Sequence, residues 1–156
     1  MKPIISKSGE GILIPLEPGS LVRFKILARD TNHAFEMYER EVPPHTIGAD
    51  PHYHEATDET FYVVSGTATI QVGEKRKPFA AGSIVVVPRR TVHGYWNETA
   101  EPIKLLITFC PGLDHDRFFQ GLSRLKAGPP DRYVDDLAAL RKEFGSVSVP
   151  DGLKAG

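Results

Sequence analysis

Three histidines and one glutamate occur at spacings that suit a metal site. His52 and His54 are two residues apart, and side chains at i and i+2 of an extended chain point to the same side, so the two imidazoles project together. Glu59 opens the next apolar run, and a hairpin at residues 55–58 would bring its carboxylate back beside them. His93 follows a proline turn at Pro88 and supplies a third imidazole.

Three imidazoles and one carboxylate form a mixed nitrogen and oxygen ligand set. Such a set suits divalent Fe, Ni, Mn, Cu, Co or Zn, and it leaves coordination positions open on an octahedral ion. Neither segment contains a thiolate, which argues against a closed structural zinc site. We therefore expect a divalent transition metal with a functional rather than a structural role, held by His52, His54, Glu59 and His93.

The elements that position these residues are predicted to be short strands. Turn-forming residues separate eight apolar or alternating runs up to about residue 110, a pattern that favours an all-β sandwich or barrel over alternating strands and helices. The wholly apolar run Ile84–Val87 fits an interior strand. The eight runs cover residues 11–16, 20–27, 34–42, 60–65, 67–72, 83–87, 92–96 and 103–109.

A helical pattern follows. Apolar residues at helical spacing predict one helix capped by Asp114 and ended by Gly128, and a second capped by Asp131 and closed by Gly145. Each helix has one apolar stripe, so we expect both to pack on the barrel or on a partner subunit. The tail from Ser146 to Gly156 is expected to be loose.

Two motifs in the sequence resemble those of the cupins. His52, His54, Glu59 and Gly66 match the first cupin motif, with Gly48 slightly closer to His52 than is usual. Gly82, Pro88, His93 and Asn97 match the second, and Arg90 stands where the family prefers glycine. If Arg90 adopts the left-handed conformation of that glycine, the cost is about 1 kcal/mol.

The resemblance implies a conical double-stranded β-helix, the cupin or jelly-roll barrel, with the metal held by His52, His54, Glu59 and His93. Together with the helical pattern, we expect a cupin barrel domain (1–112), a C-terminal helical extension (113–145) and a loose tail (146–156). Residues 58–66 and 87–93 are similar to those of quercetin-dioxygenase-like small cupins, and small cupins often pair as homodimers.

Strand alternation suggests which side chains share a pocket with the metal. Phe61 and Val63 have the parity of Glu59, and Tyr95 has that of His93, so all three are candidate pocket walls. The Tyr95 hydroxyl is a candidate catalytic group that orients substrate, and Glu59 could ligate the metal or accept a proton. The other histidines, His33, His45 and His115, are expected to be solvated.

The composition limits the classes of binding partner that we expect. The chain has 156 residues, 19 Lys and Arg against 20 Asp and Glu, and one cysteine. Nucleic acid is an unexpected partner because no basic block is present, and a membrane is unexpected because no long apolar run occurs. Without a signal-peptide pattern the expected location is cytoplasmic. A chain of this size can form its core without a metal.

We therefore expect a metal-binding cupin that is a dioxygenase acting on a small aromatic or enolisable organic substrate. Two alternatives remain open. One is non-redox metal chemistry, such as an isomerase, cyclase or lyase, and the other is a small-molecule-binding cupin without catalysis. Turnover with zinc, which has no redox chemistry, would favour the former alternative.

Overall fold

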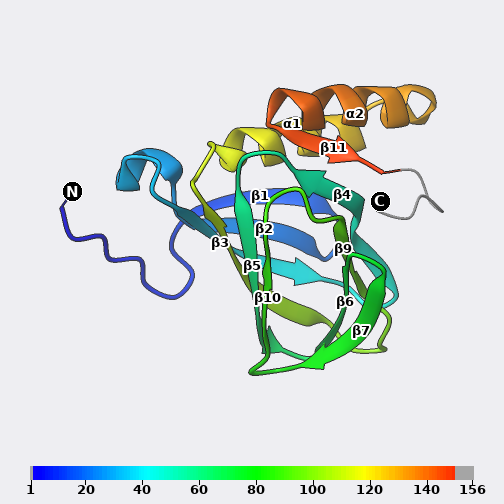
Figure 1. The fold of residues 1–156 in the computed structure, drawn as a ribbon, viewed down its shortest axis with the longest axis horizontal. Helices are drawn as coiled ribbons and strands as arrows, with labels where there is room; N and C mark the ends of the chain where they lie inside the picture. Colours follow the sequence, from blue (N-terminus) through cyan, green and yellow to red (C-terminus); the bar gives the residue numbers. More distant parts are fainter. Residues whose placement is uncertain (1, 150–156) are drawn as a thin grey trace.

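A computed structural model describes residues 2–149 of the chain. Its strands form two antiparallel sheets, and two helices lie at one end of them (Figure 1). The strands are β1 (Ile12–Glu17), β2 (Ser20–Ile26), β3 (Glu36–Val42), β4 (Thr46–His54), β5 (Asp58–Ser65), β6 (Thr67–Val72), β7 (Lys75–Ala80), β8 (Ile84–Val87), β9 (His93–Asn97), β10 (Ile103–Cys110) and β11 (Ser146–Ser148). The helices are α1 (His115–Lys126) and α2 (Tyr133–Glu143), with short 3₁₀ turns at η1 (Ala28–Thr31) and η2 (Pro130–Arg132).

Strands β3 to β10 pair in a nested order. β3 pairs with β10, β4 with β9, β5 with β8, and β6 with the adjacent β7. A long antiparallel ribbon paired in this way winds into a double-stranded β-helix, and pairing of β10 with β5 and of β6 with β9 joins these pairs into two sheets. β1 and β2 extend one sheet beyond β3, and β11 extends the other beyond β4. The predicted all-β barrel with two C-terminal helices is confirmed.

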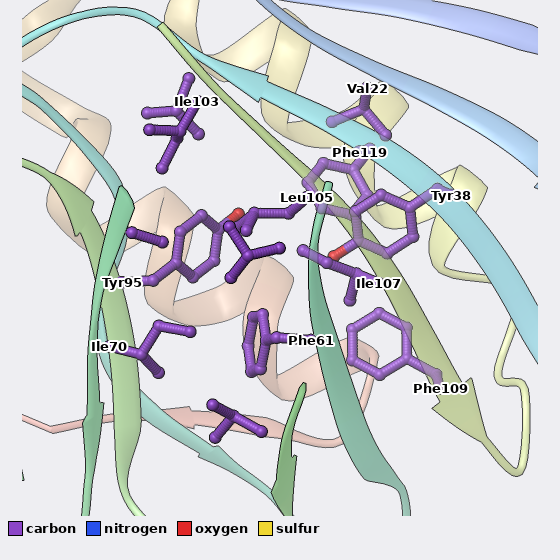
Figure 2. Packing of buried hydrophobic residues seen from close by; sticks show 14 of the residues in the cluster. Val22, Tyr38, Phe61, Ile70, Tyr95, Ile103, Leu105, Ile107, Phe109 and Phe119 are labelled. Atoms are coloured by element: carbon purple, nitrogen blue, oxygen red, sulfur yellow. The ribbon is translucent and has the colours of Figure 1, made fainter. Parts of the chain in front are cut away.

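The core lies between the two sheets because inward-facing residues alternate along the strands. On β3, for example, Tyr38 and Val42 are buried, and their neighbours Met37 and Glu39 are partly exposed. Figure 2 shows the aromatic rings inside the barrel, among them Phe61, Tyr95 and Phe109, and Phe119 reaches the same cluster from α1. This contact attaches the helical segment to the barrel core.

Two strand predictions were wrong in detail. Residues 55–58 do not form a hairpin, because β4 belongs to the five-stranded sheet and β5 to the six-stranded sheet, so the chain crosses between sheets there. Ile84–Val87 is not an interior strand: β8 is the edge strand of its sheet, with Ile84 64% and Val86 59% exposed. A wholly apolar run does not distinguish an edge strand from a central one.

The C-terminal elements also differ from expectation. Asp114 makes no side-chain cap on α1, and the Glu36 carboxylate instead accepts hydrogen bonds from the backbone N–H groups of Leu113 and His115. Asp131 lies in η2 and α2 has no side-chain cap. The start of the tail is ordered, since Ser146–Ser148 forms β11 beside β4; residues 150–156 lie outside the described residues.

Among the described residues, no helix is long and apolar enough to cross a membrane.

Candidate metal centre

The four predicted ligand residues come together inside the barrel. His52 and His54 lie on β4, Glu59 on β5 and His93 on β9, and all four are buried. One ligand atom from each lies within 4.8 Å of the other three. Glu59 Oε2 is 3.1 Å from His54 Nε2 and 2.7 Å from His93 Nε2.

The strands explain this convergence. His52 and His93 are direct partners across β4 and β9, so their side chains share a face. Glu59 arrives from the other sheet after the crossing at residues 55–57, and its position follows from the pairing of β5 with β10, where it lies opposite Phe109. Arg90 adopts the left-handed conformation expected at the motif's glycine, with φ of 65°, and its N–H donates to the His54 carbonyl.

The outward-facing nitrogen of each imidazole has its own partner. Nδ1 of His52 donates to the Asp50 carbonyl at 2.7 Å and Nδ1 of His93 to the Thr91 carbonyl at 2.8 Å. Nδ1 of His54 is 2.7 Å from the Ser146 hydroxyl. A metal-ligating histidine is normally fixed in this way through its second nitrogen, which leaves Nε2 for the ion. The donor set and its supports therefore fit a divalent transition metal.

Electrostatics favour the ligating forms of His52, His54 and Glu59. Burial lowers the pKa of His52, with smaller contributions from His93 and His54, and burial also lowers the pKa of His54. Burial acts to raise the pKa of Glu59, but hydrogen bonds with His54 and His93 outweigh it, so the pKa is lowered. For His93 burial is outweighed by the hydrogen bond with Glu59, and its pKa is raised. Of the three imidazoles, only that of His93 has a pKa shifted toward the protonated form.

A cavity of about 620 Å³ opens over this cluster. His52, His54 and Glu59 contribute to its wall, and most of the remaining lining is apolar or aromatic. The barrel provides Tyr38, Tyr95 and Phe109, and the C-terminal segment provides Phe118, Phe119, Leu122, Leu125, Tyr133 and Leu137. Such a lining suits a small, largely apolar molecule bound over the metal.

Tyr95 lies in this wall, as its parity with His93 predicted. Its ring passes so close to β4 that a Cβ on Gly48 would lie 2.0 Å from a Tyr95 ring carbon, which explains the glycine there. The hydroxyl oxygen accepts a hydrogen bond from Arg40 Nε at 3.3 Å. Burial raises the pKa of Tyr95, with Arg40 opposing and Glu59 adding to the effect, so the group keeps its proton and can donate it in a hydrogen bond.

The other predicted pocket walls do not reach the cavity. Phe61 and Val63 are fully buried in the core and are absent from its lining. Tyr38, on β3, does line it. Strand parity predicts which side chains point into the barrel, but it does not predict which of these line the cavity and which are packed in the core.

Three residues that sequence reasoning did not assign to the site come from the C-terminal segment: His115, Arg141 and Ser146. His115 is 2% exposed rather than solvated, and it stacks on Phe109 with ring centroids 3.9 Å apart. Its Nδ1 is 2.5 Å from Glu36 Oε1, and its Nε2 has no partner among the described residues. Glu36 is also fully buried. The two residues meet only in the folded chain, so the sequence alone gave no clear sign of this pair.

Comparisons with known proteins agree with this architecture. The family model of the cupin domain matches residues 38–109. An uncharacterised protein of Streptomyces coelicolor is 34% identical over 83 residues, which are 53% of this chain and 74% of that protein. The chain belongs to the cupin superfamily. The matched region contains all four candidate ligands and ends before α1.

This cupin also resembles a protein of assigned activity. It is 31% identical over 120 residues to quercetin 2,3-dioxygenase of Bacillus subtilis, a match that covers 77% of this chain but only 34% of the enzyme. The chain thus corresponds to about a third of that enzyme's length.

Solved structures share the fold at low sequence identity. KdgF from Halomonas sp. has a TM-score of 0.65 at 19% identity, covering 74% of this chain and 99% of that one. A predicted oxalate decarboxylase from Thermotoga maritima has a TM-score of 0.59 at 18% identity, covering 69% and 99%. At these identities the likeness is one of fold.

Proposed function

We propose that this cupin is a metal-dependent dioxygenase acting on a small aromatic or enolisable organic substrate. The observation that carries the proposal is the buried cluster of His52, His54, Glu59 and His93, of which the first three line a largely apolar and aromatic cavity. The match to a quercetin 2,3-dioxygenase over most of this chain supports oxygen chemistry. Quercetin itself is not implied, since that match covers a third of the enzyme.

The metal would be held by the three imidazole Nε2 atoms and the Glu59 carboxylate. When bound there, a divalent redox-active ion would act as a Lewis acid that favours the ionised form of an enol or phenol, and it would allow electron exchange with dioxygen. The overall reaction balances without an external reductant, because the substrate supplies the four electrons that reduce dioxygen and both oxygen atoms enter the products.

The protein's own groups have defined tasks in this reaction. Glu59, buried and ionised, either stays a ligand or accepts the proton that the substrate hydroxyl loses. The Tyr95 hydroxyl accepts from Arg40, so its own proton is free to be donated to a substrate oxygen. Phe118, Phe119 and Leu137 line the cavity and exclude water from the reacting atoms.

Oxygen uptake tests the proposal. Protein loaded anaerobically with Fe, Ni, Mn, Cu, Co or Zn is mixed with flavonols, catechols and 1,3-diketones in an oxygen electrode, with the matched variant His93→Gln as control. We expect one oxygen molecule consumed per substrate with a redox-active metal, and no uptake with zinc or with the variant.

Two outcomes would replace the proposal. Turnover that persists with zinc and without oxygen would assign an isomerase, cyclase or lyase. Saturable substrate binding without consumption under any metal would assign a binding protein.

The homodimer implied by the resemblance remains a prediction. Sedimentation equilibrium of the full chain measures it directly, and a mass of one chain at all concentrations would contradict it.

A further inference from the structure

Arg141 is a buried cation at the wall of the cavity. It lies in the last turn of α2, lines the cavity and is 7% exposed. Its Nη1 donates to the Ser148 hydroxyl at 2.8 Å, and within residues 2–149 the guanidinium has no other hydrogen bond and no ion pair. A buried guanidinium without a negative partner is costly, because one neutral hydroxyl does not replace the water that the charge has lost.

The pairing of β11 with β4 places this cation beside the metal ligands. Ser148 is the direct partner of His52, and Ser146 is the direct partner of His54. Partners across neighbouring strands have Cβ atoms about 5 Å apart. The hydroxyl that holds Arg141 is therefore a direct neighbour of a metal-ligand side chain, and Arg141 contributes to the lowering of the His52 pKa after burial and the other two histidines.

The groups around Arg141 leave room for an anion. Burial lowers the pKa of Arg141 and the charge of Asp50 opposes this effect, but Asp50 is exposed and makes no ion pair with Arg141 among the described residues. Glu143, in the last turn of α2, is exposed as well. Several of the five guanidinium N–H donors thus remain available at the cavity wall. The planar guanidinium fork matches a carboxylate in two parallel hydrogen bonds.

We propose that Arg141 binds a carboxylate group of the substrate, so that the cavity selects small apolar carboxylates over neutral molecules of the same shape. This inference rests on the proposed function for the rest of the substrate, whose enol or phenol oxygen would meet the metal. It assigns substrate selection to α2 and β11, which lie outside the region that matches the cupin domain.

Binding measurements on zinc-loaded full-length protein test the inference without turnover. The probes are benzoate, phenylacetate and 3-phenylpropanoate, each paired with its neutral amide, measured by isothermal titration calorimetry. We expect at least one acid to bind about tenfold or more tightly than its amide, as a charge-assisted contact provides. In Arg141→Gln this preference disappears and the amide affinity stays the same.

Two further variants separate charge from fold. Arg141→Lys keeps the charge and should keep part of the preference, and Arg132→Gln removes the same charge from an exposed position paired with Asp136 and should change nothing. Thermal melts confirm that each variant is folded. A preference unchanged in Arg141→Gln, as expected if the acid binds the metal instead, would overturn the proposal, and so would acids that bind no more tightly than their amides in every pair.

This test is independent of oxygen chemistry. If oxygen uptake fails while the acid preference depends on Arg141, the dioxygenase assignment falls and the carboxylate subsite stands. If oxygen uptake succeeds and the acid preference is absent, the dioxygenase assignment stands and the carboxylate subsite falls.

Discussion

The barrel strands and the C-terminal segment, residues 113–149, contribute to the same site in different ways. β4, β5 and β9 hold the four candidate ligands, and their positions follow from strand pairing. The C-terminal segment covers the cavity and adds Ser146 against His54, and Arg141 at its wall. The barrel therefore holds the candidate metal ligands, whereas the carboxylate selection proposed above depends on the part of the chain beyond the barrel.

The largest expected effect comes from removing a ligand on the barrel. His93→Gln should lower metal affinity by more than about a hundredfold, because loss of even a supporting partner costs ten- to a hundredfold. Metal content after dialysis, measured by mass spectrometry, checks this. His45→Gln, on an exposed histidine just before β4, is the control and should keep full content; loss of metal in both would contradict the assignment.

Removing the metal should abolish oxygen uptake and leave the barrel folded. The apolar core between the sheets holds the strands together, and Glu59 has hydrogen bonds with His54 and His93 in the absence of an ion. Binding stabilises the native state by about 3–4 kcal/mol at a hundred- to thousandfold excess over Kd, so the melting temperature should drop by several degrees. Circular dichroism melts with chelator check this, and the loss of a cooperative transition would be the opposing result.

A smaller effect is expected from the C-terminal segment. Ser146→Ala removes the hydroxyl on His54 Nδ1 and should weaken metal binding about tenfold with little change in fold. Competition with a fluorescent chelator measures the affinity. Ser123→Ala removes a hydroxyl that donates to the Pro15 carbonyl and should leave the metal affinity unchanged. Equal affinities in wild type and both variants would remove the functional distinction between the two regions.

Metal binding should release about one proton, and that proton comes from the barrel. The hydrogen bond with Glu59 raises the pKa of His93, whereas burial lowers the pKa values of His52 and His54, so we expect the released proton to come from His93. Release should approach one proton at pH values below the raised pKa and fall toward zero above it, with affinity decreasing as pH falls. Calorimetry in buffers of different ionisation enthalpy counts the protons, and release of three would contradict this electrostatic picture.

The smallest effect concerns the backbone beneath His54. Arg90 has φ of 65°, so Arg90→Gly should stabilise the barrel by roughly 0.5–1 kcal/mol after allowing for the greater freedom of glycine when unfolded. Urea unfolding measures the change. Arg89→Gly, which removes the ion pair with Asp58, should not stabilise; a loss of stability in Arg90→Gly would show that its side chain has another role.

The sequence predicted the ligand set because its signal is local. His52 and His54 share a face by strand parity alone, and the cupin motifs supply His93 and Glu59. The route to Glu59 was wrong, since residues 55–57 cross between sheets rather than turning within one. The predicted direction of the Glu59 side chain was nevertheless right, because it depends on alternation along its own strand, β5, which was predicted.

The C-terminal contributions could not be predicted for a physical reason. Ser146 meets His54 across 92 residues of sequence, and no periodicity links the two. His115 was expected to be solvated, but it is buried beside Glu36 from β3, which also replaces Asp114 as the partner of the helix N–H groups. Contacts of this kind are fixed by tertiary packing rather than by local pattern.

An anomalous difference map from crystals of metal-loaded protein tests the central claim most directly. The account predicts one strong peak about 2.0–2.2 Å from Nε2 of His52, His54 and His93 and from a Glu59 oxygen, at the wall of the cavity. A peak at other side chains, or no peak in protein that contains metal in solution, would contradict it.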